Sequence, residues 1–470
     1  MIIYKTIKTP AGYYVYDRGT HTILKIEKGI YNVLNNCENK ESRQKDNEFQ
    51  AAIKKFNIAG YLLENTVEKI EHPNKEDLSY YCNNKIQQLT LQVTQRCNLR
   101  CGYCVYGGDY MNREHSNKDM DFELAKKAIN YLVEHSDHSR DIILAFYGGE
   151  PLLRYEFIEQ CVIYIESLMN PAFVSYTLTT NGTLLTCDMV DFFSDHNFHV
   201  MISIDGSKEE HNANRCFADG TGSFECIMRN LKLIHENKPN FLKNVHINCV
   251  LNPKQNYDKV KSFFGTDSII QGASVMMNVV STENKKSQTE FAIEFWYARL
   301  YEELLLNIFL LRKCKSSELP ESVLLRAKSL NKDYSRLKDV KGLGKCAHHN
   351  GPCLPGVRRL FVNVNGDFYP CERVPENANV FKIGNIESGI DIVNAQRILN
   401  IGKLTEDQCK NCWALMQCSI CAQKAYDDSD KDNLSARIKL QHCADSKLNA
   451  YSILKKICIL KEFGYKFDEE

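Results

Sequence analysis

Six short apolar runs, rich in β-branched residues, alternate with helical stretches through the middle of this chain and constrain its fold most strongly. The runs are QQLTLQV, DIILAFYG, VSYTLTT, FHVMISID, NVHINCV and ASVMMNVV. Strands that alternate with helices pair in parallel through right-handed crossovers. Because only six such runs occur, we expect an α/β fold with a partial (β/α)6 barrel. In such folds the chemistry lies in the loops at the C-terminal ends of the strands.

The segments on either side of this barrel have a different character. Residues 1–80 begin with strand-like GYYVYDRG and HTILKIEKG and continue with two helical segments, the second of which ends at Gly60. This order predicts a small α+β domain, winged-helix-like, followed by a linker over KIEHPNKEDLSYY. The rest of the chain divides into a barrel domain at 87–285, a helical bridging segment at 286–344 and a cysteine-dense domain at 345–470.

The bridging segment and the cysteine-dense domain each carry one clear pattern. FAIEFWYARLYEELLLNIFLLRK has an aromatic and leucine stripe, which we expect to pack in a core. RLFVNVNGDFYPC alternates polar and apolar residues across Asn365-Gly366, which predicts a β-hairpin.

Charge and composition exclude several classes of function. The formal net charge is zero and no long basic run occurs, which argues against a nucleic-acid partner. The first residues, MIIYKTIKTPAGYY, resemble no signal peptide, and no long apolar run predicts a membrane helix. We therefore expect a cytoplasmic protein. In that compartment the 20 cysteines are metal ligands more readily than disulfides.

Three of these cysteines lie together in TQRCNLRCGYCVYGG, directly after the first strand-like run. Cys97, Cys101 and Cys104 have the spacing C-x3-C-x2-C. A [4Fe–4S] cube is fully ligated by four cysteines, so three would leave one iron open to nitrogen and oxygen donors of a small molecule. The alternatives are a zinc site completed by a distant residue, or buried cysteines. Zinc knuckles usually add a second ligand pair, and none lies nearby.

This stretch resembles the hallmark of the radical S-adenosylmethionine enzymes, which place an aromatic residue, here Tyr103, before the third cysteine. Three later strand ends are also similar to that family. They are YGGEP with Gly148, Gly149 and Glu150, TTNGTLL with Thr180 and Asn181, and SIDG with a later arginine, which gives Ser203, Asp205 and Arg215. The resemblance implies that the three cysteines hold a [4Fe–4S] cluster. S-adenosylmethionine would be its fourth ligand and the other residues would contact that molecule.

The resemblance also implies a mechanism. One electron, from a donor such as flavodoxin or ferredoxin, passes through the cluster to the sulfonium and leaves a 5′-deoxyadenosyl radical. That radical takes hydrogen from an unactivated carbon, while the protein positions the target.

Seven downstream cysteines form a second pattern, C-x12-G-x4-C followed by C-x2-C-x5-C-x2-C and one more cysteine. It is similar to the SPASM extension of the same enzymes, which holds two auxiliary clusters. The usual form has three residues before its sixth cysteine, where this chain has two. The resemblance implies one [4Fe–4S] cluster on Cys346, Cys353, Cys371 and Cys421 and another on Cys409, Cys412, Cys418 and Cys443.

Two alternatives stay open in this domain. Cys346 either ligates the first auxiliary cluster or leaves it an open iron for a substrate thiol. Cys409, Cys412, Cys418 and Cys421 would alternatively form a zinc ribbon. The remaining nine cysteines, including Cys161, Cys187 and Cys249, are expected to be buried apolar residues.

Glu372 follows Cys371 directly, where the sulfatase-maturing relatives implied by the resemblance have an aspartate proposed as proton acceptor. Glu372 is therefore a candidate base for a substrate thiol or amide. The alternative is an exposed glutamate at the end of a hairpin.

SPASM-type enzymes act mostly on peptides and proteins, and residues 1–80 resemble the leader-recognition module of ribosomal peptide maturases. That module adds an extended leader to a sheet edge; the alternative is a plain α+β cap. The run CVYGGDYMNREHSNKDM resembles maturases of cysteine-rich clostridial-type peptides. Its polar residues are either at the site entrance or in an ordinary loop. They are Asp109, Tyr110, His115 and Asn117.

The resemblance implies a peptide maturase that forms thioether cross-links, from cysteine sulfur to carbon, in a ribosomally made cysteine-rich precursor peptide. Carbon–carbon cross-linking, epimerisation and sulfatase-type oxidation of cysteine or serine are alternatives within the class. A non-catalytic iron–sulfur scaffold that binds peptides is an alternative from another class, and it predicts no cleavage of S-adenosylmethionine.

Overall fold

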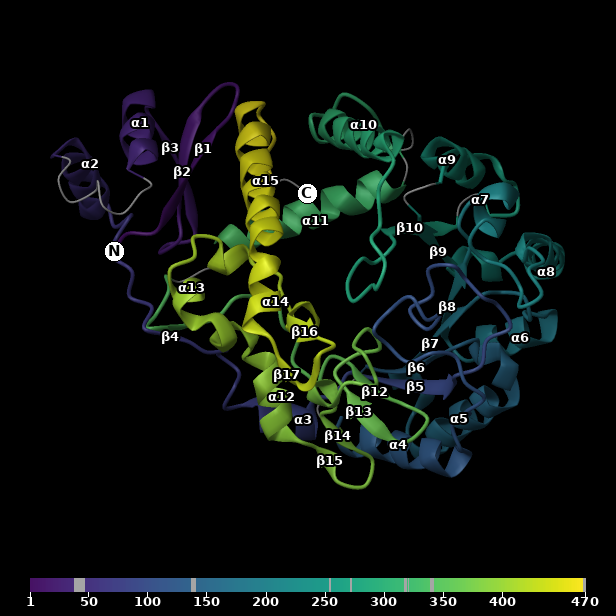
Figure 1. Ribbon diagram of the computed structural model, residues 1–470. Coiled ribbons are helices and arrows are strands. Elements are labelled where there is room, and N and C mark those ends of the chain that lie inside the picture. The colour runs from purple at the N-terminus through teal and green to yellow at the C-terminus, as the bar shows by residue number, and fades with distance from the viewer. Residues whose placement is uncertain are drawn as a thin grey trace.

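The computed structural model describes residues 1–37, 47–136, 141–252, 255–270, 273–316, 319, 321–338 and 342–467. Its main parallel sheet lies on the right in Figure 1. Its strands are β5 (Gln88–Thr94), β6 (Ile142–Gly148), β7 (Val174–Thr180), β8 (Phe198–Ser203), β9 (His246–Leu251) and β10 (Ser274–Val279). They lie in the order β10-β9-β8-β7-β6-β5, and each pairs in parallel with its neighbour. The expected partial (β/α)6 barrel is confirmed.

Helices connect these strands and cover the outside of the sheet. They are α4 (Phe122–Glu134), η1 (Pro151–Arg154), α5 (Tyr155–Leu168), η2 (Pro171–Phe173), α6 (Cys187–Asp195), α7 (Lys208–Asn212), α8 (Phe224–Asn237), η3 (Phe241–Asn244) and α9 (Tyr257–Thr266). Helix α4 shows why such segments form here. The side chain of Asp121 caps its first turn by accepting from the Glu123 amide, and Ala125, Ile129 and Leu132 bury one face at helical spacing.

The cysteine-dense domain continues the barrel sheet. β12 (Leu360–Val362) pairs in parallel with β5, and β13 (Asp367–Tyr369), β14 (Gly384–Asn385) and β15 (Gly389–Ile390) follow outward. The predicted hairpin is present as β12 and β13. Its turn requires glycine, because Gly366 has φ +83° and a Cβ there would lie 2.9 Å from Leu124 Cδ1. The pairing of β12 with β5 makes the two domains share one core.

The rest of this domain consists of short elements and one long helix. They are β11 (Cys346–Ala347), η5 (Asn379–Phe381), α12 (Ile392–Leu399), η6 (Ile401–Thr405), α13 (Glu406–Lys410), η7 (Leu415–Gln417), η8 (Ala422–Ala425), β16 (Tyr426–Asp427), β17 (Asp430–Leu434), α14 (Ala436–Gln441) and α15 (Cys443–Glu462).

The N-terminal residues form an antiparallel sheet beside α15 (Figure 1). The elements are β1 (Tyr4–Lys8), β2 (Tyr13–Asp17), β3 (Thr22–Ile26), α1 (Lys28–Asn36) and α2 (Asn47–Ile58). The predicted pair is β2 and β3, and β1 is an additional strand on the other side of β2. Side chains of this sheet pack against Leu454 and Cys458 of α15. Arg18 donates to the carbonyl oxygen of Lys410 at 2.7 Å, in the cysteine-dense domain.

Two expectations for the connecting segments were wrong in part. The segment YLLENTVEKIEH, which also suggests a further strand, contains β4 (Lys69–Ile70), and β4 pairs with β11. The predicted linker over KIEHPNKEDLSYY is wrong where it contains helix α3 (Leu78–Asn84), whose Leu78 and Cys82 reach the main core. In the bridging segment, α10 (Ile293–Leu310) and α11 (Glu321–Lys338) pack together, but only part of the apolar stripe of α10 is buried. Its exposed members are Ile293, Trp296, Tyr297, Leu300, Tyr301 and Leu304.

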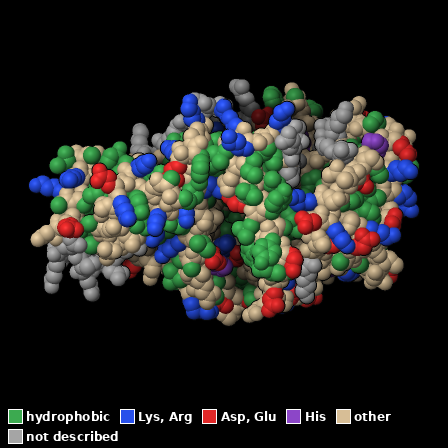
Figure 2. Space-filling model, turned by 90° about the horizontal axis from the view of Figure 1, so that it is seen from above, with side chains coloured by type: hydrophobic (Ala, Val, Ile, Leu, Met, Phe, Trp, Pro, Cys, Tyr) green, Lys and Arg blue, Asp and Glu red, His purple; other side chains and the backbone are tan. Residues whose placement is uncertain are grey.

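The exposed side of α10 lies at the top of the molecule. Figure 2, seen from above, shows hydrophobic side chains gathered over the middle of this face. Among the described helices, none has the length and apolar character that crossing a bilayer requires.

Candidate active site

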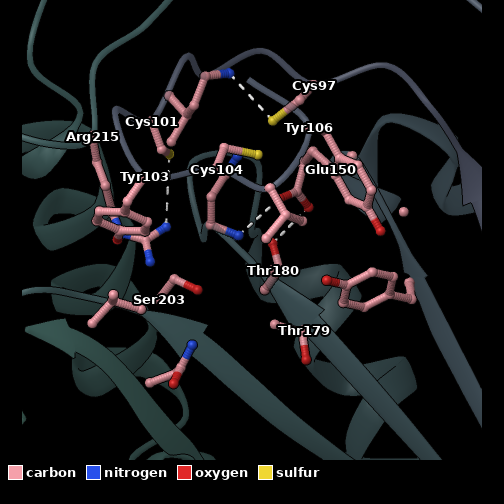
Figure 3. A pocket seen from close by; sticks show the side chains of 18 of the residues that line it. Cys97, Cys101, Tyr103, Cys104, Tyr106, Glu150, Thr179, Thr180, Ser203 and Arg215 are labelled. Carbon is pink, nitrogen blue, oxygen red and sulfur yellow. Dashed lines mark hydrogen bonds between the residues drawn. The ribbon is translucent and has the colours of Figure 1, made fainter. Parts of the chain in front are cut away.

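A cavity of about 300 Å³ opens at the C-terminal ends of the barrel strands, where the fold predicts the chemistry. Cys97, Cys101 and Cys104 form one side of it on the loop after β5. Side chains at the ends of the later strands face them across the cavity, among them Glu150, Thr180 and Ser203 (Figure 3). All of the predicted cofactor residues except Asp205 line this cavity.

The cysteine loop is held in place by the glycines after β6. The amides of Gly149 and Glu150 donate to the carbonyl oxygens of Thr94 and Arg96, each at 2.8 Å. A Cβ on Gly149 would lie 1.9 Å from the Arg96 oxygen, and one on Gly148 would lie 2.2 Å from the Thr94 oxygen. Both positions therefore need glycine, because the two loops touch backbone to backbone.

Glu150 links the end of β7, through hydrogen bonds, to the contact between the GGEP loop and the cysteine loop. Its carboxylate is 1% exposed and accepts from Thr180 Oγ1 and the Asn181 amide, both at 2.7 Å. Burial raises the pKa of Glu150, although these donors and the Leu152 amide oppose the shift. The Asn181 side chain donates to Asn98 Oδ1 at 2.8 Å, within the cysteine loop. The ends of β6 and β7 and the cysteine loop are thus one hydrogen-bonded unit.

Asp205 lies behind the cavity wall and accepts hydrogen bonds from three of its residues. It accepts from the Tyr103 hydroxyl, from Arg215 Nε at 2.9 Å and from the Val250 amide at 3.0 Å. Burial alone would lower the pKa of Arg215, but Asp205 raises it above its usual value, so the guanidinium keeps its charge. Arg215 also lies 3.9 Å from Cys101 Sγ. The site therefore places a fixed cation beside the thiols.

Sequence reasoning missed several residues of the wall. Tyr106, Tyr147, Thr179, Asn248 and Val250 also line the cavity. All but Tyr106 lie on barrel strands, at or near the C-terminal ends, so the strand-end rule would have found them. Of the loop residues expected at the entrance, Tyr110 and His115 line the cavity. Asp109 instead accepts from Ser287 Oγ, and Asn117 is exposed.

Four of the downstream cysteines surround a second cavity of about 120 Å³. They are Cys409, Cys412, Cys418 and Cys443, the set expected for the second auxiliary cluster. Cys421, which a zinc ribbon would need, does not line this cavity. No group of three or more His, Cys, Asp or Glu side chains in the described part of the chain is placed to hold a single metal ion.

The thiols expected for the first auxiliary cluster are less closely grouped. Burial raises the pKa of Cys371 to about 12, and among the neighbouring charges that contribute are those of Glu372 and Cys421. These two thiols are therefore close. Cys353 is exposed, and Cys346 is exposed on β11, 3.9 Å from a carboxylate oxygen of Glu71. The structure leaves the ligand role of Cys346 a prediction.

Glu372 is not the exposed hairpin glutamate of the alternative interpretation. One oxygen accepts from Arg359 at 2.7 Å, while the other is buried without a hydrogen-bond partner among the described residues. Burial, and next the Glu372 carboxylate, raise the pKa of Tyr147. Glu372 therefore lies beside Tyr147, a residue of the wall of the first cavity.

Comparison with protein families gives two matches. The Radical SAM superfamily matches residues 91–265, and the SPASM iron–sulfur cluster-binding domain matches residues 353–413. The first match includes the three-cysteine loop and every predicted cofactor residue. The second includes Cys353, Cys371, Cys409 and Cys412 and ends before the remaining three cysteines.

Curated relatives cover different shares of the chain. The cysteine-type anaerobic sulfatase-maturating enzyme of Clostridium novyi is 32% identical over 38% of this chain, and the match spans 48% of that enzyme. The radical SAM cyclopropyl synthase TigE of Paramaledivibacter caminithermalis is 21% identical over 73% of this chain and 80% of its own length. The first match thus spans about half of its relative.

A solved structure shows the same fold over most of the chain. The structure of anSMEcpe with bound AdoMet and Cp18Cys peptide aligns with a TM-score of 0.55 and 20% identity, over 80% of this chain and 99% of its own.

Proposed function

We propose that this chain, which carries a radical SAM domain followed by an SPASM domain, is a peptide maturase that forms thioether cross-links in a ribosomally made cysteine-rich peptide. One observation carries the proposal. The three-cysteine loop and the strand-end residues line a single cavity, and one wall residue, Tyr147, lies close enough to Glu372 for that carboxylate to raise its pKa.

The residues of the first cavity divide into two roles. Cys97, Cys101 and Cys104 hold a [4Fe–4S] cluster and leave one iron for S-adenosylmethionine. The residues that contact S-adenosylmethionine are Tyr103, Gly148, Gly149, Glu150, Thr180, Asn181, Ser203 and Arg215, with Asp205 behind them. Buried carboxylate and guanidinium groups at fixed positions suit the amino and carboxylate groups of its methionine part.

When bound, the clusters and S-adenosylmethionine supply a 5′-deoxyadenosyl radical and, in the SPASM domain, an acceptor for one electron. The atoms balance as follows. One substrate carbon loses a hydrogen atom, which forms 5′-deoxyadenosine. A cysteine thiol of the same peptide loses its proton to Glu372, its sulfur bonds to that carbon, and one electron leaves. Each link therefore removes two hydrogens from the peptide.

The N-terminal domain supports a peptide substrate. Within the described residues β3 pairs with β2 alone, so its outer edge is open to an added strand. A leader peptide would bind there through main-chain hydrogen bonds, which are tolerant of sequence. The electron that starts each turnover would come from a flavodoxin or a ferredoxin.

The first test is the mass of the precursor peptide after anaerobic incubation with reconstituted enzyme, S-adenosylmethionine and reductant, followed by thiol alkylation. We expect a loss of two hydrogens per event, with a matching loss of alkylatable thiols. Hydrogen loss with every thiol still alkylatable would establish carbon–carbon cross-linking instead.

A second candidate is a sulfatase-type maturase, which the similarity to the Clostridium novyi enzyme favours. In that case a cysteine side chain would lose its sulfur on conversion to an aldehyde, which the same mass spectrum distinguishes. An unchanged mass would point to epimerisation or to no reaction, and hydrolysis with chiral analysis of the residues separates those two.

The cluster assignment has its own test. Replacing Cys97, Cys101 and Cys104 together with alanine should abolish release of 5′-deoxyadenosine and leave leader binding by the N-terminal domain unchanged. Release that persists in this variant would rule out the assignment, and a non-catalytic scaffold would show no release even in the unaltered protein.

A further inference from the structure

The second cavity holds a lysine that is almost completely buried. Lys439 of α14 is 1% exposed, and its ammonium donates to Thr405 Oγ1 at 2.5 Å and to Cys409 Sγ at 3.6 Å. Cys443, another thiol of this cavity, follows one helical turn later. Among the described residues, no carboxylate lies within ion-pair distance of Lys439.

A buried ammonium without a counter-charge is costly, because desolvation strongly disfavours the charged form. Hydroxyl and thiol dipoles offset only part of that cost. The groups in this cavity that can become anionic are the four thiols, and as cluster ligands all four are thiolates. The position of Lys439 therefore fits a net negative group in the cavity.

His349 adds an unused hydrogen-bond donor to the same cavity. It is 1% exposed and lines the cavity. Its Nδ1 accepts from the Gly351 amide at 3.2 Å, so in the neutral ring the proton is on Nε2. Nε2 is buried and has no hydrogen-bond partner among the described residues. Burial lowers the pKa of His349 to about 2, which keeps the ring neutral.

The preceding residue, His348, differs from His349 because both of its ring nitrogens have hydrogen-bond partners. His348 donates from Nδ1 to the His349 carbonyl oxygen at 2.8 Å and accepts at Nε2 from the Gly402 amide at 2.9 Å. Both of its nitrogens are satisfied, so His348 is a structural residue. His349, by contrast, lines the cavity with a ring whose Nε2–H has no acceptor among the described residues.

We propose that Lys439 and His349 set the reduction potential of the second auxiliary cluster by stabilising its reduced form. Reduction adds one negative charge, which a buried cation and an N–H donor to sulfur both favour. The two residues therefore raise the potential and make this cluster a better electron acceptor than it would be without them. This inference rests on the iron–sulfur assignment of the cavity, and the experiment distinguishes a failure of that assignment from a failure of the inference.

The experiment measures midpoint potentials in the full chain with Cys97, Cys101 and Cys104 replaced by alanine, so that only auxiliary clusters contribute. The protein is reconstituted with iron and sulfide and titrated under EPR detection. Lys439→Met should lower one midpoint potential by about 59 mV or more, a tenfold change in the one-electron equilibrium. Lys439→Arg should keep the potential near its original value, and His349→Phe should lower it by less.

Lys232→Met is the matched control. Lys232 of α8 has a side chain that is 66% exposed and lines neither cavity, so solvent screens its charge and the potential should not change. Unchanged potentials in Lys439→Met with full iron content would overturn the proposal. Loss of one cluster in both Lys439→Met and Lys439→Arg would also overturn it, because the role would then be structural. Loss in Lys439→Met alone would support the charge requirement. If the unaltered second site binds no iron, the assignment of the cavity itself fails.

Discussion

The Glu372 carboxylate has one oxygen held by Arg359 and one left without a partner, and this division suits a base. Glu372→Gln keeps the size and shape of the side chain, but the amide cannot accept the proton of the substrate thiol. We expect 5′-deoxyadenosine still to form, while cross-linked peptide falls at least about a hundredfold, the usual contribution of a positioned base. The measurement is the ratio of the two products by mass spectrometry.

A matched control for this variant is Glu387→Gln. Glu387 is a surface glutamate paired with Lys127, and its side chain is 71% exposed. It should change neither product. If both products fell together in Glu372→Gln, the residue would act on the binding of S-adenosylmethionine and not on the substrate thiol.

At the scale of residues, the sequence predicted which thiols lie together better than it predicted what surrounds them. The family resemblance assigned Cys409, Cys412, Cys418 and Cys443 to one group, and the four line one cavity. Lys439 and His349 carried no such signal, because lysine and histidine are common and their burial depends on packing. The four-residue spacing from Lys439 to Cys443 was the available clue, since it puts both on one side of a helix.

At the scale of elements, the site depends on two loops pressed together. Gly149→Ala would put a Cβ 1.9 Å from the Arg96 carbonyl oxygen, so the GGEP loop or the cysteine loop must move. We expect the variant to retain less iron at the first site and to lose S-adenosylmethionine binding. Iron content and calorimetric titration measure the two effects.

Gly265→Ala is the control for that backbone clash. A Cβ on Gly265 would meet nothing within 4 Å, and the residue lies in α9. This change should leave iron content and binding as they were and should slightly stabilise the helix. Normal iron content and binding in Gly149→Ala would show that the two loops are not held as described.

The docking of the N-terminal sheet on α15 gives a second prediction at this scale. Glu462 accepts from Thr9 Oγ1 at 2.5 Å and from the Tyr14 hydroxyl at 2.9 Å. Thr9 Oγ1 can still donate to the Gly12 carbonyl oxygen at 3.1 Å, so Glu462→Ala takes the acceptor mainly from the Tyr14 hydroxyl, a loss that typically costs about 1–3 kcal/mol. We expect faster amide hydrogen exchange in β1 and β2, measured by mass spectrometry. Asn449→Ala, an exposed position on the same helix, should leave exchange unchanged.

The elements themselves were predictable where the apolar pattern was long. All six barrel strands and the Gly366 hairpin follow from it. β1 was missed because YKTIK has no turn signal that marks it off, and α3 was read as a linker because it is only seven residues long. β1 packs through Ile7 against α15, and α3 packs against the main core, and local pattern does not reveal such distant partners.

For the whole molecule, buried neutral histidines predict sensitivity to acid. Burial lowers the pKa of His21, His211 and His348 to about 4. The unfolded chain binds these protons below about pH 6.5, whereas the folded chain does not until about pH 4, so stability falls as pH drops between those values. At pH 5.5 the loss is on the order of 1 kcal/mol for each histidine.

Thermal unfolding between pH 7.5 and 5.5 measures this effect. His21→Gln should show a shallower loss of melting temperature with acid than the unaltered chain, because one proton-binding difference is removed. Equal slopes in the two proteins would mean that His21 already titrates in the folded state.

The contact between the first strands and the last long helix also affects how the chain can fold during synthesis. β1 and β2 leave the ribosome before α15, which supplies Leu454, Cys458 and Glu462 to their outer face. Until α15 is made, one side of the early sheet stays uncovered. The N-terminal sheet therefore completes its packing only more than 400 residues after it is made, which is roughly the sequence separation of Thr9 and Glu462, and a chain interrupted before α15 would expose that apolar surface to proteases and to other nascent chains.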